Sequence, residues 1–115
     1  MTKSIHISLD AMGGDNAPRI IVDGAAQSKI RYPDVKFSFF GNKNKLLPLV
    51  SSLKILKDSQ IIHTDEIIGA NQKPSIAVRK GKNSSMGLAI QSVKTGQTDA
   101  IVSAGNTGAL MAMTK

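Results

Sequence analysis

Residues 4–18 read Ser4-Ile5-His6-Ile7-Ser8-Leu9-Asp10-Ala11-Met12-Gly13-Gly14-Asp15-Asn16-Ala17-Pro18, and this stretch decides the fold class. Its first six residues alternate between polar and apolar side chains, which is the period-two pattern of a β-strand. The glycines, acids and amide that follow predict a turn-rich loop, and Pro18 suits the first turn of a helix. Helical spacing then continues to Tyr32 and Pro33. The stretch therefore predicts a strand, a loop and a helix, in that order.

The same order recurs along the rest of the chain. Apolar or alternating segments predict three more strands, at residues 35–40, 60–63 and 98–103. Apolar residues at helical spacing predict further helices, at residues 46–53, 86–96 and 106–115. Pro48 is tolerable only near the start of its helix. The stretch between the third strand and the next helix is expected to be irregular through Pro74.

Strands that alternate with helices imply right-handed crossovers and a parallel sheet that is covered on both faces. We therefore predict the α/β class, as a three-layer α/β/α sandwich with a mainly parallel sheet. At 115 residues the chain can hold one domain at most. Because the final helical segment has neither a cap nor a following strand, we expect residues 1–115 to be part of a single, truncated α/β domain.

Charge and composition exclude several classes of protein. With 15 Lys and Arg against 8 Asp and Glu, the net charge is +7, which either favours an anionic partner or only aids solubility. The absence of cysteine excludes a disulfide framework, a thiolate metal site and a thioester on the enzyme, and makes the cytoplasm the simplest compartment. His6 and His63 lack metal-ligand spacing, and no nucleic-acid-binding motif accompanies the charge. We therefore expect neither a metal nor a nucleic-acid partner.

The strongest candidate loop follows the last strand and reads Ser103-Ala104-Gly105-Asn106-Thr107-Gly108. Ligands of open parallel sheets gather beyond the carboxyl ends of the strands, where helix N-termini present unpaired N–H groups. Glycine lets the backbone approach an oxyanion, and Ser103 and Thr107 add hydroxyl groups. The alternative is a tight turn in which Asn106 or Thr107 only caps the helix.

A second candidate loop follows the first strand and contains Gly13, Gly14, Asp15 and Asn16. Asp10 directly follows the strand, so its carboxylate is placed to orient a nucleophile or hold a cation. The alternative is that these Asp and Asn side chains only build the turn by bonding their own backbone.

A third candidate is a basic cluster, with Lys80 and Lys82, that precedes Ser84 and Ser85 at the start of a helix. Ser84 suits the N-cap of that helix. Positive charge beside a helix N-terminus fits phosphate or an acidic protein surface, and the alternative is a solvated basic loop. No serine lies in a GxSxG elbow, so a serine nucleophile is not expected.

Five segments with matching order and spacing carry a family resemblance: Leu9–Pro18, Arg79-Lys80, Ser84-Ser85-Met86, Val93-Lys94 with Gly96, and Val102–Leu110, "VSAGNTGAL". Together they resemble the PlsX family of phosphate acyltransferases of bacterial phospholipid synthesis. The resemblance covers essentially the whole chain and matches only the N-terminal part of such a protein.

The resemblance implies an enzyme that transfers a long-chain acyl group from acyl carrier protein to inorganic phosphate, giving acyl phosphate. It implies a fold similar to that of phosphotransacetylases and of isocitrate and isopropylmalate dehydrogenases. It also implies a cytoplasmic homodimer that is loosely associated with the inner face of the membrane and needs no cofactor. The alternatives are a phosphotransacetylase that uses coenzyme A thioesters and a non-catalytic module that binds phosphate or acyl carrier protein.

The resemblance carries over Asp10, Lys80 and Asn106 as family-motif positions without fixing a role for each, and we expect these three to be catalytic. We expect a larger set of motif positions to bind phosphate or the acyl group: Gly13, Gly14, Asp15, Asn16, Lys82, Ser84, Ser85, Ser103, Gly105, Thr107 and Gly108. Phosphate is itself the nucleophile in such a reaction, so the protein needs only to align it with the thioester and to stabilise an oxyanion. We expect backbone N–H groups at Gly105, Asn106 and Thr107 to hold that oxyanion.

Overall fold

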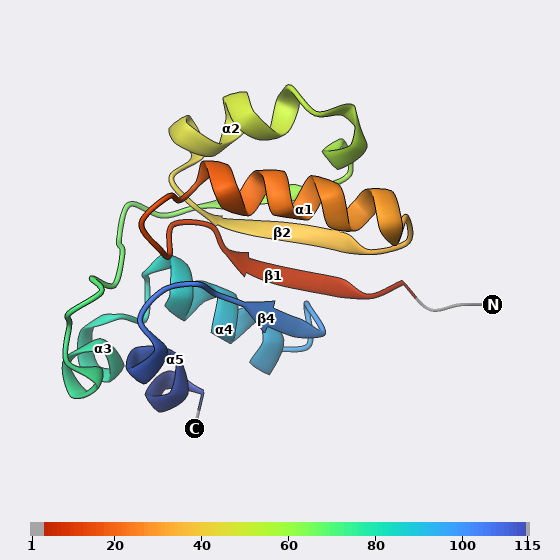
Figure 1. The fold of residues 1–115 in the computed structure, drawn as a ribbon. Helices are drawn as coiled ribbons and strands as arrows, with labels where there is room; N and C mark the ends of the chain where they lie inside the picture. The colour runs from red at the N-terminus through yellow and green to blue at the C-terminus, as the bar shows by residue number, and fades with distance from the viewer. Residues whose placement is uncertain (1–3, 115) are drawn as a thin grey trace.

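Strands and helices alternate along residues 4–114, the part of the chain that the computed structural model describes (Figure 1). The elements in chain order are β1 (His6–Asp10), α1 (Arg19–Arg31), β2 (Lys36–Gly41), α2 (Lys43–Ser51), a short 3-10 helix (Lys54–Leu56), β3 (Gln60–His63), α3 (Pro74–Lys80), α4 (Ser85–Lys94), β4 (Ala100–Val102) and α5 (Thr107–Met113). Lys115, which ends the last expected helical segment, lies outside the described residues.

The four strands of the described part form one sheet in the order β3-β2-β1-β4, and every neighbouring pair is parallel. β1 lies between two partners: Leu9 pairs with Phe39 of β2 on one side and with Val102 of β4 on the other. All four strands therefore end at the same edge of the sheet, and the predicted parallel arrangement is confirmed.

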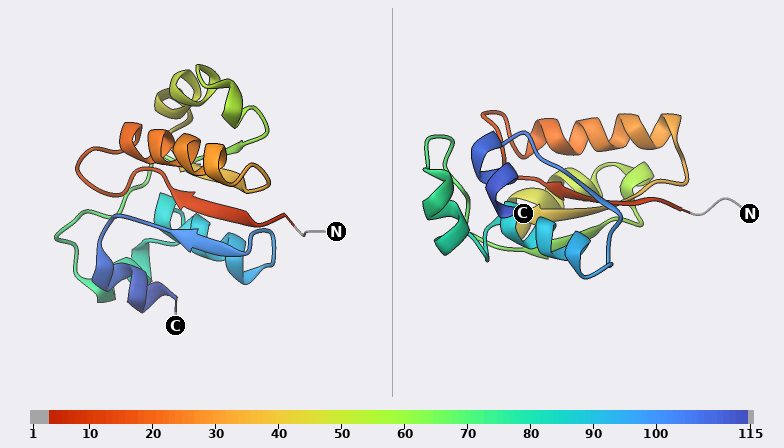
Figure 2. Two further views of the ribbon diagram at one scale, coloured as in Figure 1. Left: turned by 45° about the vertical axis from the view of Figure 1, so that its right-hand side comes forward. Right: turned by 90° about the horizontal axis from the view of Figure 1, so that it is seen from below.

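Helices cover both faces of the sheet, which confirms the predicted α/β/α layers (Figure 2). On one face, α1 and α2 pack on the apolar side of the strands through Val22 and Leu46, which meet Leu9 and Phe39 in one core. These four side chains are almost fully buried. On the other face lies α4, and a second apolar cluster forms between α3, α4, α5 and β4.

The polar side of the central strands is buried beneath α4. Ser8 and Ser38 are 0% and 2% exposed. The Ser8 hydroxyl lies 2.6 Å from the Thr98 hydroxyl, and the Thr98 hydroxyl donates to that of Ser92 at 3.1 Å. Among residues 4–114, every buried side-chain nitrogen and oxygen has a hydrogen-bond partner. Burial of this face is therefore compatible with its polar side chains.

The helices differ from the expectations in two places. The stretch after β3 is irregular up to Lys73, as expected, but the sequence did not predict α3, in which Pro74 occupies the first turn and Ala77 is fully buried against neighbouring apolar side chains. Pro48 lies in the interior of α2 instead of near its start, and the helix ends at Ser51 instead of residue 53. The helix tolerates proline here because the carbonyl that loses its partner belongs to Asn44, an exposed residue.

Candidate functional site

Three loops meet at the edge where the parallel strands end. They follow β1, β3 and β4, and together they line a cavity of about 420 Å³. The first loop contributes Gly14 and Asp15, the second contributes residues 67–70, and the third contributes residues 104–106. This edge is where open parallel sheets bind ligands, so the cavity is the candidate site.

The carboxylate of Asp10 lies behind the cavity lining, at the end of β1, and is 2% exposed. Its Oδ1 accepts hydrogen bonds from the Ser85 hydroxyl at 2.6 Å and from the backbone N–H of Met12 at 3.3 Å. Its Oδ2 accepts a hydrogen bond from the Ser103 hydroxyl at 2.8 Å, and the Ser103 oxygen accepts one from the N–H of Gly105 at 3.1 Å. Side chains from the three predicted stretches thus converge on one carboxylate.

Glycine is required where the first and third loops touch. A methyl group on Gly13 would lie 2.8 Å from Oδ2 of Asp10 and 2.9 Å from the nitrogen of Gly105, closer than real contacts allow. Gly14 adopts a φ of +92°, a conformation that other residues rarely accept, and packs against Ala104. Asp15 and Asn16 are exposed beside this contact.

The side chain of Asn106 caps α5 and also holds a neighbouring loop. Its Oδ1 accepts a hydrogen bond from the N–H of Ala109 at 3.0 Å. Its Nδ2 donates to the carbonyl of Gly69 at 3.1 Å and to that of Gln72 at 2.7 Å. The cap considered as an alternative in the sequence is therefore present.

Free backbone donors remain in the same turn. Among residues 4–114, the N–H groups of Asn106, Thr107 and Gly108 have no acceptor, whereas the N–H of Gly105 is bound to Ser103. An anion at this turn would thus find free N–H donors at residues 106–108. The expected set was residues 105–107, so Gly108 takes the place of Gly105.

The basic cluster lies apart from the cavity. Lys80 is the exposed last residue of α3, and Lys82 lines a different cavity, between α4 and the end of α5. Ser84 is the N-cap of α4: its oxygen accepts a hydrogen bond from the N–H of Gly87 at 3.0 Å, and its hydroxyl donates to Gly81. Of the candidate residues in the third predicted stretch, residues 80–85, only Ser85 forms a hydrogen bond with the Asp10 carboxylate.

The second loop of the site, residues 66–72, was missed from the sequence because its small and apolar residues carry no catalytic group. Ile67, Ile68, Gly69 and Ala70 line the cavity. The location of this loop at the site could have been predicted from the topology, because the third predicted parallel strand must end at the same edge of the sheet as the first and the fourth.

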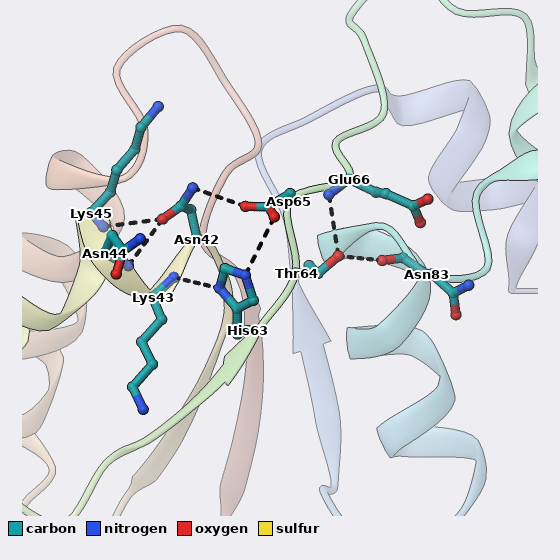
Figure 3. Close-up of polar contacts among 9 residues, drawn as sticks. All are labelled: Asn42, Lys43, Asn44, Lys45, His63, Thr64, Asp65, Glu66 and Asn83. Atoms are coloured by element: carbon teal, nitrogen blue, oxygen red, sulfur yellow. Dashed lines mark hydrogen bonds and ion pairs between the residues drawn. The ribbon is translucent and has the colours of Figure 1, made fainter.

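A further polar cluster lies at the ends of β2 and β3 (Figure 3). The amide of Asn42 donates to Asp65 at 3.1 Å, while its oxygen accepts from the N–H groups at the start of α2. His63 Nδ1 accepts a hydrogen bond from the N–H of Lys43 at 3.0 Å. These contacts explain His63 as a residue that supports the start of α2.

Residues 4–114 contain no group of three or more His, Asp or Glu side chains arranged to hold a metal ion. In the same range, no helix combines the length and the apolar character that crossing a bilayer requires. The expected lack of a metal and of a cofactor stays a prediction.

A parallel α/β/α fold with a glycine-lined cavity at its carboxyl edge defines the chain as a member of the ligand-binding α/β class. The family model described as "Fatty acid synthesis protein" matches residues 5–115. The chain belongs to this family.

Relatives with high identity carry the name phosphate acyltransferase. The protein of Parvibaculum lavamentivorans is 48% identical over 117 residues, which cover 100% of this chain and 32% of the relative. That of Rhodospirillum rubrum is 47% identical over 116 residues, covering 100% and 33%. That of Brucella ovis is 50% identical over 113 residues, covering 96% and 33%. The chain spans about a third of the length of these relatives, at their N-terminal end.

Proposed function

We propose that this chain supplies the N-terminal third of a phosphate acyltransferase, which moves a long-chain acyl group from acyl carrier protein to inorganic phosphate. The observation that carries the proposal is the convergence of Ser85 and Ser103 on the buried carboxylate of Asp10, beside a glycine-lined cavity. The name of the relatives, phosphate acyltransferase, supports acyl transfer that involves phosphate, and the acyl carrier protein and the long chain are part of our proposal.

The chemistry needs alignment and charge stabilisation more than a protein nucleophile. A phosphate oxygen attacks the thioester carbon, the C–S bond breaks, and the acyl phosphate and a thiol leave. The protein gains rate by holding phosphate in line with the carbonyl and by binding the oxyanion of the tetrahedral intermediate. No cysteine is required on the enzyme.

In this proposal the turn before α5 binds an oxyanion through the free N–H groups of Asn106, Thr107 and Gly108. Asp10 is buried and both of its oxygens accept hydrogen bonds, so it acts through Ser103. The Ser103 hydroxyl donates to Asp10, and the Ser103 oxygen accepts a hydrogen bond from the N–H of Gly105. Gly13 allows that close approach, and Ser85 holds the other carboxylate oxygen.

The remaining predicted residues have outer roles in this proposal. Gly14 and Asp15 border the phosphate side of the cavity, Asn16 follows them in the same exposed loop, and Ser84 fixes the start of α4. Lys80 and Lys82 are exposed and add positive charge that attracts an anionic substrate or an acidic carrier protein. Homodimer formation, a cytoplasmic location and peripheral membrane association belong to the full-length protein and stay proposals.

The test uses a full-length chimera, meaning residues 1–115 joined to the remaining two thirds of the Parvibaculum relative. The chimera is incubated with phosphate and either palmitoyl carrier protein or palmitoyl coenzyme A, and acyl phosphate is measured. We expect product from the carrier protein. Product from the coenzyme only would favour a phosphotransacetylase, and binding of phosphate or carrier protein without any product would favour a non-catalytic module.

A further inference from the structure

The loop after β3 is anchored where it begins. The Thr64 hydroxyl donates to the carbonyl of Asn83 and accepts a hydrogen bond from the N–H of Glu66 at 3.2 Å (Figure 3). The carbonyl of Glu66 accepts from the N–H of Ser85 at 2.9 Å. Ile68 is 7% exposed and packs in the apolar cluster beneath α4 and α5. The start of the loop is therefore fixed beside the helix that carries Ser85.

The other end of the loop is held by the side chain of Asn106. The side-chain amide donates one hydrogen bond to the carbonyl of Gly69 and one to that of Gln72, and its oxygen accepts a hydrogen bond from the N–H of Ala109 in α5. Within the loop, the N–H of Gly69 donates to Oε1 of Gln72 at 3.3 Å. Every hydrogen-bonding group of the Asn106 side chain is thus engaged with protein, and a substrate would have to displace one of these bonds.

Ile67 lies between the two anchors. It is 49% exposed although it lines the cavity, whereas its neighbour Ile68 is directed into the core. The rest of the lining comes from Met12, Gly14 and Asp15 and from the turn at residues 104–106. The cavity therefore combines the exposed apolar side chain of Ile67 with polar groups of Asp15 and Asn106, which fits a ligand with an alkyl chain next to a charged or carbonyl group.

From this geometry we propose that residues 67–70 form the wall against which the alkyl chain of the acyl substrate lies, and that Gln72 anchors the end of this wall. Ile67 is the residue that contacts the chain, and the Asn106 side chain is a positioning group that holds the wall. The inference rests on the proposed function, since it places the acyl donor in the same cavity. In this inference the Asn106 side chain helps to position the substrate, and backbone N–H groups bind the oxyanion.

The first test changes the wall itself. In the full-length chimera, Ile67→Ala is compared with Ile30→Ala, which shortens an isoleucine that is 68% exposed on α1. We expect kcat/KM for a palmitoyl donor to fall roughly tenfold with Ile67→Ala, while a butyryl donor and the KM for phosphate change less than about twofold. Ile30→Ala should leave all three unchanged. Equal losses for both donors, or no loss for either, would overturn the proposal.

The second test releases the wall without removing the helix cap. Serine is as good an N-cap as asparagine but has no amide to donate, so Asn106→Ser keeps the cap of α5 and frees Gly69 and Gln72. The matched control is Asn42→Ser, which makes the same change at the start of α2, outside the cavity (Figure 3).

Hydrogen exchange and kinetics report on this release. With Asn106→Ser we expect faster exchange in residues 69–72, retained protection at Ala109, and a KM for the palmitoyl donor that rises about tenfold with kcat nearly unchanged. Asn42→Ser should do none of these. A fall in kcat at constant KM would return the Asn106 side chain to a catalytic role and overturn the proposal. If Asn106→Ser does not fold, Gln72→Ala tests the same wall with the same two measurements: it removes the side-chain acceptor of the Gly69 N–H and leaves the two Asn106 bonds in place.

A binding measurement separates this proposal from the proposed reaction. Hexadecylphosphonate, kept below its micelle concentration, should slow exchange in residues 67–72 of the chimera, and Ile67→Ala should weaken that protection. Butylphosphonate should protect far less. Protection without any acyl phosphate formation would overturn the reaction and support the alkyl wall. Acyl phosphate formation without protection would overturn the wall and leave the reaction standing.

Discussion

The Ser85 hydroxyl donates a 2.6 Å hydrogen bond to Asp10, a residue 75 positions earlier in the chain. Both side chains are at most 2% exposed, so the bond forms in a dry environment. It joins the start of α4 to the end of β1, and through Asp10 it reaches Ser103 after β4. The candidate site is therefore built on a single buried carboxylate that three distant segments share.

Loss of the Ser85 hydroxyl should destabilise the protein. Ser85→Ala leaves Oδ1 of Asp10 with only the long bond from Met12, and a hydrogen bond to a charged group is worth about 1.5–3 kcal/mol. We expect a decrease of that size in the free energy of unfolding of the full-length chimera, measured by denaturant titration. The control is Ser51→Ala, whose exposed hydroxyl bonds a carbonyl of its own helix and should matter by less than about 0.5 kcal/mol. Equal effects of the two variants would contradict the role given to Asp10.

Gly13→Ala and Gly24→Ala should have opposite effects. A methyl group at Gly13 meets Asp10 and Gly105, so we expect destabilisation by about 1–3 kcal/mol and loss of acyl phosphate formation. Gly24 lies exposed inside α1 with nothing within 4 Å of the added methyl group, so alanine there should stabilise by up to about 1 kcal/mol. Thermal unfolding and the product assay check both. A harmless Gly13→Ala would show that the loops do not approach as described.

Lys80→Met tests the role of positive charge in the basic cluster outside the cavity. If Lys80 attracts an anionic substrate, its replacement should lower kcat/KM about tenfold at low ionic strength, and added salt should narrow the difference. Lys57→Met removes an equally exposed lysine after the short 3-10 helix and serves as the control. The same loss for both variants would show a general effect of net charge, and no loss for Lys80→Met would remove it from the site.

Lys29 gives a test of the core that does not involve the site. It is 7% exposed, its Nζ donates to the carbonyl of Val35 at 2.6 Å, and Asp58 lies 3.5 Å away. Lys29→Met keeps the aliphatic stem but leaves that carbonyl unpaired, so we expect a loss of about 1–3 kcal/mol in the free energy of unfolding with unchanged KM values. Lys45→Met, at an exposed side chain that extends away from its neighbours in Figure 3, should be neutral. A neutral Lys29→Met would contradict this account.

The sequence predicted the elements whose pattern is strong. Alternation at residues 4–9 located β1 to within two residues at its start and one at its end, because a half-apolar strand has a clear period. It did not predict α3, whose apolar residues, Ile76, Ala77 and Val78, are consecutive and show no helical period. That helix depends on tertiary contacts of Ala77 and Pro74, which no local pattern contains.

The site was predictable in part. Glycine and acid at the end of a strand pointed to Asp10 and Gly13, and the order of parallel strands placed Ser103 at the same edge. The bond from Ser85 to Asp10 depends on how α4 crosses the sheet, and the hold of Asn106 on Gly69 and Gln72 depends on a loop without a motif. Both are contacts between distant segments, which spacing along the chain cannot encode.

The position of β1 between β2 and β4 has a consequence during synthesis. Its N–H at His6 bonds to Asp99, a residue made 93 positions later, while its other neighbour, β2, follows soon after it. The first strand therefore leaves the ribosome long before one of its two sides can be covered. Folding of such nonlocal pairings is slow and leaves unpaired strand edges open to aggregation. The carboxylate at the end of that strand acquires its serine partners only once nearly the whole segment has been translated.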